Sequence, residues 1–235
     1  MWQLSSTLVC LSAALWTSTS LLAVERHPPK VTSAQVEGRV IYRPDPKRRW
    51  RYARYYVKDR RQGFLAEAVV ELRGKGLKSA RRGTPQTVSM DQKNFQFIPE
   101  TLAIRAGDSV RFTSRDPETH NVRTTGRLAS FNVNMPRGGE YVHKFDRGGG
   151  IRRPVRIGCV FHGAMRAWIY VFDHPHYQVT GTDGRFRLDA VPPGEYELEM
   201  FHPAGKLRSR RSIRIVAGQN VQIDIPVSPA NKIGG

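Results

Sequence analysis

Beyond residue 23 the chain contains no long stretch in which apolar residues recur at helical spacing. Short runs appear instead, with alternating apolar and polar residues or clustered β-branched residues, and Gly, Pro, Asp and Asn separate them. That pattern is typical of an all-β protein. It predicts strands over residues 35–42, 66–73, 87–91, 94–97, 101–105, 109–114, 141–145, 155–158, 167–172, 177–180, 185–189, 194–201, 212–216 and 219–226.

The last third of the chain has a second, more regular pattern. Phe186 and Leu188 alternate with basic residues, and the turn Pro192-Pro193-Gly194 separates this strand from the next. Alternate residues of a strand share a face, so each of these strands is predicted to present one apolar face. Residues 229–235 are predicted to form a disordered tail.

The first residues resemble an export signal. Residues 7–23 are uncharged and largely apolar, and the first charge follows at Glu25. The apolar stretch is short for a membrane-spanning helix, and small residues near its end suit signal peptidase. We expect a signal peptide over residues 1–23, with an uncleaved membrane anchor as the alternative. The protein is therefore expected in the periplasm or at the cell surface.

Cys159 would be the one cysteine left after removal of this segment, because Cys10 lies within it. An exported chain with a single thiol cannot form an internal disulfide. Cys159 opens the run Cys159-Val160-Phe161-His162-Gly163-Ala164-Met165, which places a thiol, an imidazole and a thioether in one short loop. This donor set suits copper better than zinc, calcium or magnesium. The alternative is a buried, inert thiol.

His120 is the best candidate for a fourth ligand. It follows a predicted strand that ends near Ser114 and precedes a polar segment, so we expect it in a loop at one end of a sandwich. Together with Cys159 and His162 it would supply two imidazoles and a thiolate, and Met165 would be a weak axial ligand. The backbone N–H of Asn121 is the candidate donor to the thiolate. Taken singly, a histidine is more often structural and a methionine more often part of a core.

Residues 90–173 resemble a cupredoxin of the plastocyanin and amicyanin type. The resemblance rests on Phe97-Ile98-Pro99, on residues 102–112 with their Ala-Gly-Asp turn, on His120-Asn121-Val122 and on the cysteine loop. It implies a Greek-key β-sandwich that holds one type 1 copper through His120, Cys159, His162 and Met165. The short Cys-His-Met spacing is similar to amicyanin, although Gly163 stands where amicyanin-like loops often have proline.

The last third resembles a carboxypeptidase regulatory-like domain, a small transthyretin-like β-sandwich. The resemblance rests on residues 182–188 and 191–198 and on the strand that follows residues 216–219, whereas the first strands of that family match residues 36–40 and 65–74. We therefore expect the cupredoxin sandwich to be inserted in, or adjacent to, the transthyretin-like sandwich. The predicted domains are residues 34–75 and 175–228 for the transthyretin-like sandwich and 86–173 for the cupredoxin.

The net charge of +18 favours acidic partners. Basic residues interleave with Trp50, Tyr52, Tyr55 and Tyr56 over residues 47–61, a composition also found in nucleic-acid sites. Export argues against nucleic acid, which leaves a solvated loop or a docking patch for an acidic protein. An anionic cell surface is a further contact that the charge favours.

These features predict an exported blue copper protein that transfers single electrons and is not an enzyme. The cupredoxin resemblance implies docking near His162, through Phe161, Ala164 and Met165. The expected partner is a redox protein with an acidic surface. The alternatives are a copper-binding or delivery protein that does not cycle, and a carbohydrate- or surface-binding module. His174 and His176 form at most an incomplete second metal site, and a solvated linker is the simpler interpretation.

Overall fold

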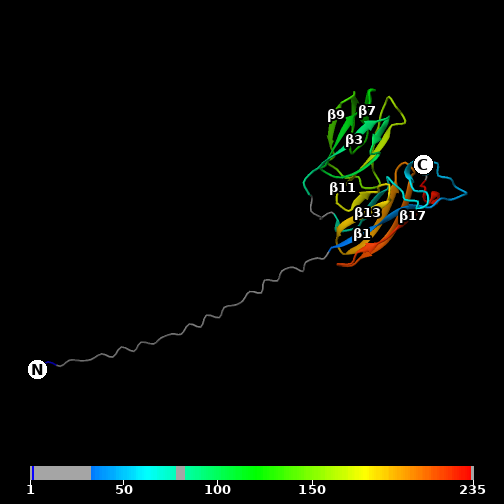
Figure 1. Cartoon of the computed structure of the whole chain (residues 1–235). Helices are drawn as coiled ribbons and strands as arrows, with labels where there is room; N and C mark the ends of the chain where they lie inside the picture. Colours follow the sequence, from blue (N-terminus) through cyan, green and yellow to red (C-terminus); the bar gives the residue numbers. More distant parts are fainter. Residues whose placement is uncertain (1, 3–32, 78–82, 234–235) are drawn as a thin grey trace. The chain divides into compact units, whose positions relative to one another are not determined.

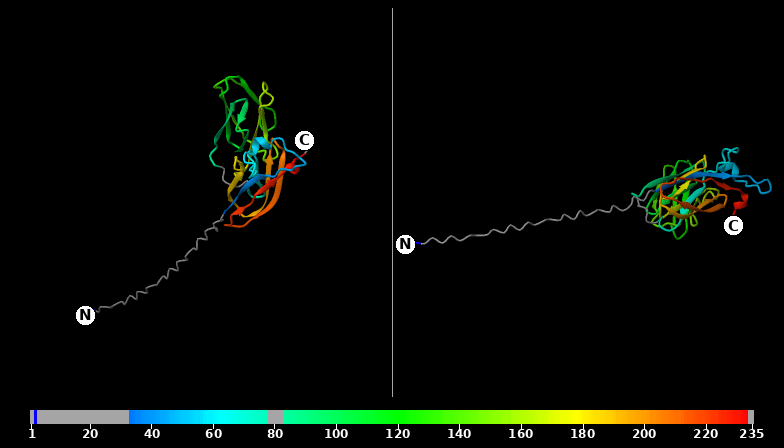
Figure 2. Two further views of the ribbon diagram at one scale, coloured as in Figure 1. Left: turned by 45° about the vertical axis from the view of Figure 1, so that its right-hand side comes forward. Right: turned by 90° about the horizontal axis from the view of Figure 1, so that it is seen from below.

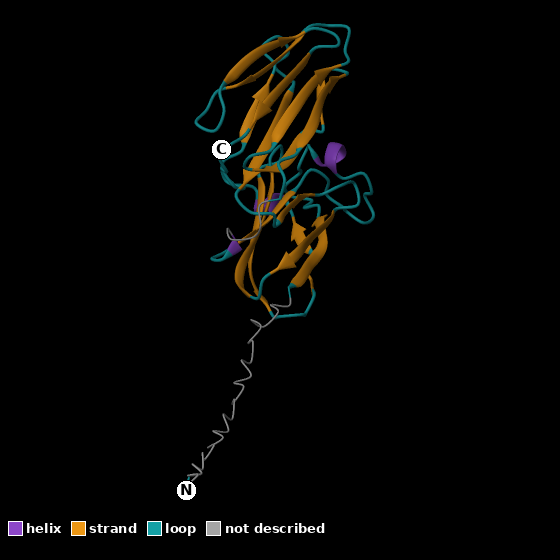
Figure 3. Ribbon diagram, turned by 90° about the vertical axis from the view of Figure 1, so that its left-hand side faces the viewer, coloured by secondary structure: helices purple, strands orange, loops and turns teal. Residues whose placement is uncertain are grey.

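The computed structural model describes residue 2 and residues 33–77 and 83–233. The predicted signal segment, apart from Trp2, and Cys10 therefore lie outside the described residues. Within the described part strands dominate, and the helical segments are short, among them α1 (Ala53–Tyr56) and the 3-10 helix η2 (Pro229–Asn231) (Figure 3). No helix in this part is long and apolar enough to cross a membrane. The prediction of an all-β chain is confirmed.

The strands group into four sheets. In chain order they are β1 (Ala34–Tyr42), β2 (Val69–Arg73), β3 (Thr87–Lys93), β4 (Gln96–Ile98), β5 (Thr101–Arg105), β6 (Ser109–Ser114), β7 (His120–Thr124), β8 (Phe131–Met135), β9 (Glu140–Lys144), β10 (Val155–Gly158), β11 (Arg166–Phe172), β12 (Tyr177–Val179), β13 (Arg185–Val191), β14 (Gly194–His202), β15 (Leu207–Ile215), β16 (Val221–Gln222) and β17 (Ile225–Val227).

Two of the sheets form a sandwich that contains both the first and the last strands, here called the outer sandwich. One sheet has the order β13-β1-β16, with β17 also paired to β1, and the other has the order β12-β2-β14-β15. Alternate residues of β1, such as Val36 and Val40, pack in one core with Phe186 of β13 and with Leu72 and Leu198 of the facing sheet. In β1 and β13 the buried positions alternate with more exposed ones, as the alternation in the sequence predicts for strands with one apolar face.

The other two sheets, β4-β3-β6-β9 and β5-β11-β10-β7-β8, form a second sandwich, here called the inserted sandwich. Its core joins Met90, Val110 and Phe112 from the first sheet with Ile157 and Ile169 from the second. Cys159 and Met165 belong to the same core. In Figure 1 the inserted strands β3, β7 and β9 lie together, apart from β1, β13 and β17.

The chain leaves the outer sandwich and returns to it at one place. Strand β2 ends at Arg73, and β12 pairs antiparallel with β2 so that Tyr177 lies opposite Glu71. Residues 36–39 of β1 pair with residues 185–188 of β13 rather than with any strand of the inserted sandwich. Both the β12–β2 and the β1–β13 pairing are expected if one sandwich is inserted in the other. The inserted segment must leave and re-enter the host sandwich at neighbouring positions. The exact domain boundaries stay predictions.

Strand β11 is buried on both faces, and the two faces serve different cores. Ala167, Ile169 and Val171 point into the inserted sandwich. The alternate residues, Trp168, Tyr170 and Phe172, pack with Val69 of β2 in a separate cluster that joins the two sandwiches. An almost continuous apolar run, rather than alternation, is what a strand covered on both sides requires.

The basic and aromatic segment of residues 47–61, here called the basic-aromatic loop, connects β1 to β2 and contains α1. Trp50 and Tyr56 are buried in the outer core, where both rings pack against His202. The interpretation of this segment as a solvated loop is wrong for Trp50 and Tyr56, because burial of large rings outweighs the cost of ordering the loop. The left view of Figure 2 shows this segment, in cyan, beside the inserted sandwich.

Two strands and the ordered tail differ from the sequence prediction. His120 begins β7, and β7 pairs with β8, neither of which was predicted because Asn and Arg dominate their exposed positions. The predicted disorder of the tail is wrong for residues 229–233: Ser228 caps η2, and the Ile233 N–H donates to the Lys206 carbonyl over 2.9 Å. Residues 234 and 235 lie outside the described residues.

Candidate metal centre

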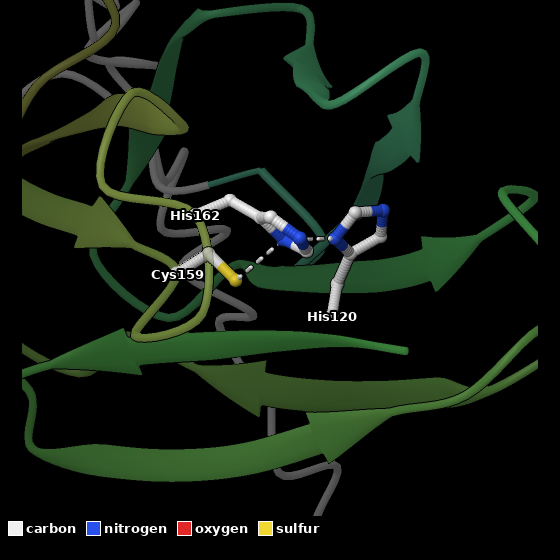
Figure 4. A group of neighbouring side chains, drawn as sticks. All are labelled: His120, Cys159 and His162. Atoms are coloured by element: carbon white, nitrogen blue, oxygen red, sulfur yellow. Dashed lines mark hydrogen bonds between the residues drawn. The ribbon is translucent and has the colours of Figure 1, made fainter. Parts of the chain in front are cut away.

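Three predicted ligands, His120, Cys159 and His162, meet at one end of the inserted sandwich (Figure 4). His120 is the first residue of β7 and is fully buried. Cys159 directly follows β10 and is 6% exposed, whereas His162 lies half-buried in the loop that leads to β11. Residues far apart in the sequence are therefore brought together because β7 and β10 are neighbours in one sheet.

The potential ligand atoms of these three residues all lie within 4.8 Å of one another. The Nδ1 atoms of His120 and His162 are 3.0 Å apart, and the Cys159 Sγ lies 3.6 Å from the His162 Nδ1. Figure 4 shows the two imidazole nitrogens facing each other, with the sulfur on the His162 side. Two nitrogens and one sulfur thus form a compact triangle.

Asp116 determines which nitrogen of His120 faces this triangle. Its Oδ2 lies 2.8 Å from the His120 Nε2. Burial raises the pKa of the Asp116 carboxyl, but hydrogen bonds from the Phe95 N–H, from His120 and from the Asn94 N–H together lower it below its ordinary value. An ionised carboxylate can only accept, so Nε2 carries the proton and the Nδ1 lone pair is left for a metal.

A tight turn between β3 and β4 covers the two histidines. Asn94 and Phe95 both have positive φ, 55° and 58°, and their N–H groups donate to Asp116 over 2.6 Å and 2.9 Å. The Phe95 ring meets His162 and His120 at right angles, with centroid distances of 4.8 Å and 5.4 Å. Neither Phe95 nor Asp116 was predicted as part of the site; the Asn at the turn and the Asp four residues before His120 were the available signals.

Met165 is buried, 3% exposed, where the cysteine loop joins β11. Its N–H donates to the His162 carbonyl over 2.9 Å, which closes the loop into a turn. The hydrogen bond therefore holds the end of the cysteine loop, at Met165, close to the backbone of His162. Its sulfur as a fourth ligand stays a prediction.

Asn121 holds β7 against its neighbours. Its side-chain amide donates to the Asn132 Oδ1 over 2.7 Å and to the Val133 carbonyl over 3.2 Å. The backbone carbonyl of Asn121 accepts from the side-chain amide of Gln92 over 3.2 Å. These bonds fix the strand that carries His120. The hydrogen bond predicted from the Asn121 N–H to the thiolate stays a prediction.

The donor set fits a copper ion. Metal–nitrogen and metal–sulfur bonds of about 2.0 and 2.3 Å, as in zinc sites, place adjacent donor atoms roughly 3 to 4 Å apart. The observed separations of 3.0 and 3.6 Å lie in this range. Two imidazoles and a thiolate, with a thioether nearby in sequence, favour copper over harder ions, and the carboxylate behind His120 is the outer partner that metal-bound histidines use.

His174 and His176 do not form a comparable group. Both are buried, at 9% and 1% exposed, so the expectation of a solvated linker is wrong. The His174 Nε2 lies 3.3 Å from the Glu71 Oε1, and its Nδ1 accepts from the His176 N–H. They are buried because they lie where the chain re-enters the outer sandwich. Within residues 33–77 and 83–233, His120, Cys159 and His162 form the one cluster of three or more such ligands.

No protein-family model matches the chain, and a search of curated proteins finds no match. Among solved structures, a copper-containing nitrite reductase from Thermus scotoductus SA-01 is 21% identical with a TM-score of 0.34; the match covers 40% of this chain and 24% of that one. This chain thus spans about a quarter of that enzyme.

Two smaller proteins are matched over almost their whole length. A purple cupredoxin from Nitrosopumilus maritimus is 20% identical with a TM-score of 0.32, over 36% of this chain and 98% of that one. Amicyanin from Paracoccus versutus is 16% identical with a TM-score of 0.33, over 43% of this chain and 97% of that one. Because the identities and TM-scores are this low, a function for the chain has to be argued from the side chains of the site and not from these similar structures.

Proposed function

We propose that the protein binds one copper ion through His120, Cys159, His162 and Met165 and transfers single electrons. The observation that carries this proposal is the meeting of two imidazole Nδ1 atoms and one cysteine sulfur within 4.8 Å. A trigonal set of two histidines and a cysteine, with a weak axial methionine, is the ligand set of type 1 electron-transfer copper.

Bound copper would supply a one-electron Cu(II)/Cu(I) couple. The chain's own residues would keep the geometry constant between the two states. Asp116 orients His120, the Phe95 ring packs edge-on against both imidazoles, and the buried Cys159 and Met165 belong to the packed core. Ligands fixed by packing and by outer hydrogen bonds need little rearrangement when the charge changes.

The proposed protein is a carrier rather than an enzyme, and it acts after export, in the periplasm or at the cell surface. Its charge of +18 would favour a redox partner with an acidic surface. We further propose that the inserted sandwich is a cupredoxin of the amicyanin type and that the outer sandwich is a carboxypeptidase regulatory-like domain. The second assignment rests on the motifs of residues 182–188 and 191–198.

The visible spectrum of the copper-loaded protein tests the proposal. We expect the intense blue absorption of Cu(II)–thiolate charge transfer, a reversible reduction in a redox titration, and loss of the band in Cys159→Ser. A verified Cu(II) form without the band, or a band that persists in Cys159→Ser, would contradict type 1 ligation. A band without reversible reduction would indicate copper handling instead of electron transfer.

Met165 is tested by a matched pair of variants. Met165→Leu should keep the blue band and raise the reduction potential, because removal of a weak thioether ligand favours Cu(I). Met90→Leu changes a buried methionine of the same core and should leave the potential at the wild-type value. Equal potentials in all three proteins would exclude Met165 as an axial ligand.

A further inference from the structure

A groove separates the basic-aromatic loop of the outer sandwich from the proposed copper loop. It has a volume of about 710 Å³, and its lining includes Tyr52, Tyr55 and Lys58 on one side and Phe95, Ile98 and Met165 on the other. Phe95 touches both proposed histidine ligands, and Met165 is the proposed axial ligand. The groove therefore extends from the outer sandwich to the metal centre.

Exposed apolar side chains gather around this groove and the copper loop. Tyr55, Phe95 and Ile98 are 52%, 45% and 42% exposed, and Val160 and Phe161 of the copper loop are 50% and 54% exposed. They account for five of the nine large hydrophobic side chains that are exposed among the described residues. Large apolar groups that collect on one face of a soluble protein indicate an interaction site.

The basic-aromatic loop contributes Lys58 to the lining of the groove and carries further basic residues next to the lining residues Tyr52 and Tyr55. Arg51 and Arg54 lie over the rings of Tyr52 and Tyr55, 5.1 Å and 4.7 Å from the centroids, and donate to the two hydroxyls. Arg51, Arg54, Lys58, Arg60 and Arg61 are exposed. None of these five is in an ion pair with a carboxylate of residues 33–77 or 83–233. Arginine and tyrosine are among the residues that contribute most to the binding energy of protein interfaces. Here the stacking holds these side chains in place before a partner binds.

The carboxylates inside the groove do not cancel this charge. Glu100 accepts a 2.7 Å hydrogen bond from the Tyr56 hydroxyl and pairs with Arg166 at 3.6 Å. Burial raises the pKa of the Glu67 carboxyl, which disfavours its charge. The bonds of Glu100 also tie the basic-aromatic loop to the strand that follows Met165, so the two sides of the groove are held together.

We propose that this groove is the docking surface of the redox partner, and that the partner is a protein whose carboxylates surround an apolar contact. The inference rests on the proposed electron transfer and extends it: the outer sandwich supplies the basic half of the docking surface through Tyr55, Arg54 and Lys58. A protein fits better than a polysaccharide because apolar side chains, among them Phe95, Ile98 and Met165, line the side of the groove that adjoins the proposed metal centre. Opposite charges across such an interface accelerate association.

Electron exchange with cytochrome c provides the test, because succinylation converts the lysines of this haem protein to carboxylates and leaves the haem in place. We compare the wild type with Arg54→Glu/Lys58→Glu at the groove and Arg211→Glu/Arg214→Glu on β15. The control residues are exposed and do not line the groove. Both double variants change the net charge equally, so a difference between them reports position rather than overall field.

We expect the groove variant to lower the second-order rate constant with succinylated cytochrome c by about tenfold or more at low salt, and the control variant to lower it much less. The difference should shrink at high salt. Tyr55→Ser should also slow this reaction, whereas Val142→Ser, at an apolar site of similar exposure on β9, should not. Unmodified cytochrome c should show no preference for the wild-type groove.

Equal rates for the groove and control variants would overturn the docking proposal. Retention of the wild type and the control variant, but not of the groove variant, on heparin, together with equal electron-transfer rates, would assign the groove to a polysaccharide and would also overturn it. The blue band and the reversible reduction are measured in every variant. Their presence keeps the proposed function intact when docking fails, and their absence in the wild type refutes the function itself.

Discussion

At the scale of single residues, Asp116 determines which ring nitrogen of His120 is available to bind a metal. The Nε2 of buried His120 meets Asp116, and its Nδ1 consequently faces the His162 Nδ1 at 3.0 Å. Without Asp116 the ring could turn or exchange its proton between the two nitrogens. The four ligand candidates could be predicted from the sequence, whereas the contact between Asp116 and His120 is established by the fold.

Asp116→Asn should weaken copper binding by about 10- to 100-fold, because outer-shell partners of metal-bound histidines contribute that much to affinity. The change removes a negative charge that also accepts the N–H groups of Asn94 and Phe95. Competition with a chelator of known copper affinity measures the effect. Asp146→Asn, at an exposed carboxylate, is the control and should bind like the wild type; equal affinities for all three would contradict the role of Asp116.

Burial is the main cause of the lowered pKa of His202. Its ring packs edge-on against Tyr56 and Trp50, and the Gly205 N–H donates to its Nδ1 over 3.0 Å. Burial lowers the pKa of His202 to about 3. The folded protein therefore keeps a neutral ring at pH values where the unfolded chain already binds a proton.

The free energy of unfolding should consequently fall as the pH decreases. The contribution of His202 is complete above the unfolded pKa of about 6.5 and is lost by up to about 1.4 kcal/mol per pH unit until the folded ring titrates. Urea denaturation of the wild type and of His202→Asn, which retains an acceptor, measures this between pH 7.5 and 4. The difference in unfolding free energy between the wild type and His202→Asn should become smaller as the pH decreases. A difference that stays constant with pH would contradict the role of His202.

At the scale of elements, the basic-aromatic loop has two functions that its composition does not separate. Trp50 and Tyr56 are 8% and 6% exposed and belong to the outer core, whereas Tyr55 is 52% exposed and lines the groove. The sequence shows only that aromatic and basic residues alternate. Which ring turns inward depends on the partner strands that are distant in the sequence, so it could not be predicted.

Trp50→Ala should therefore reduce the free energy of unfolding by about 3–5 kcal/mol, the usual cost of truncating a large buried ring. Tyr55→Ala, at the exposed position of the same loop, should cost about 0.5 kcal/mol or less. Chemical denaturation followed by circular dichroism compares the two. Similar losses in both variants would show that the loop is not divided into a buried and an exposed half.

At the scale of the whole molecule, strand β11 joins the two sandwiches. One face of β11 belongs to the inserted core, and on the other face Tyr170 and Phe172 pack with Val69 of β2. The Tyr177 ring also stacks on Phe172, with centroids 4.2 Å apart. Each sandwich thus buries apolar surface of the other, so separating them would expose it to water.

We expect the two sandwiches to unfold in one cooperative transition. Thermal unfolding of the copper-loaded protein, followed by the blue band for the inserted sandwich and by far-ultraviolet circular dichroism for all strands, should give one midpoint. Tyr170→Ala removes the centre of the shared cluster and should split or broaden the transition. Two separate midpoints in the wild type would show that the contact does not couple the sandwiches.

The all-β class, most of the strands and the loop that carries Cys159, His162 and Met165 could be predicted from local patterns in the sequence. These features are local: alternation, turn residues and ligand spacing act within a few residues of one another. The pattern also indicated His120, although as part of a loop rather than as the start of β7.

Three features depend on the tertiary structure: the contacts of Asp116 and Phe95 with the histidines, the face of β11 that joins the outer sandwich, and the groove that the basic-aromatic loop shares with Phe95 and Met165. Each of these depends on contacts between residues far apart in the chain. Such contacts form because strands must pair and apolar faces must be covered, and a pattern confined to neighbouring residues does not specify the partner.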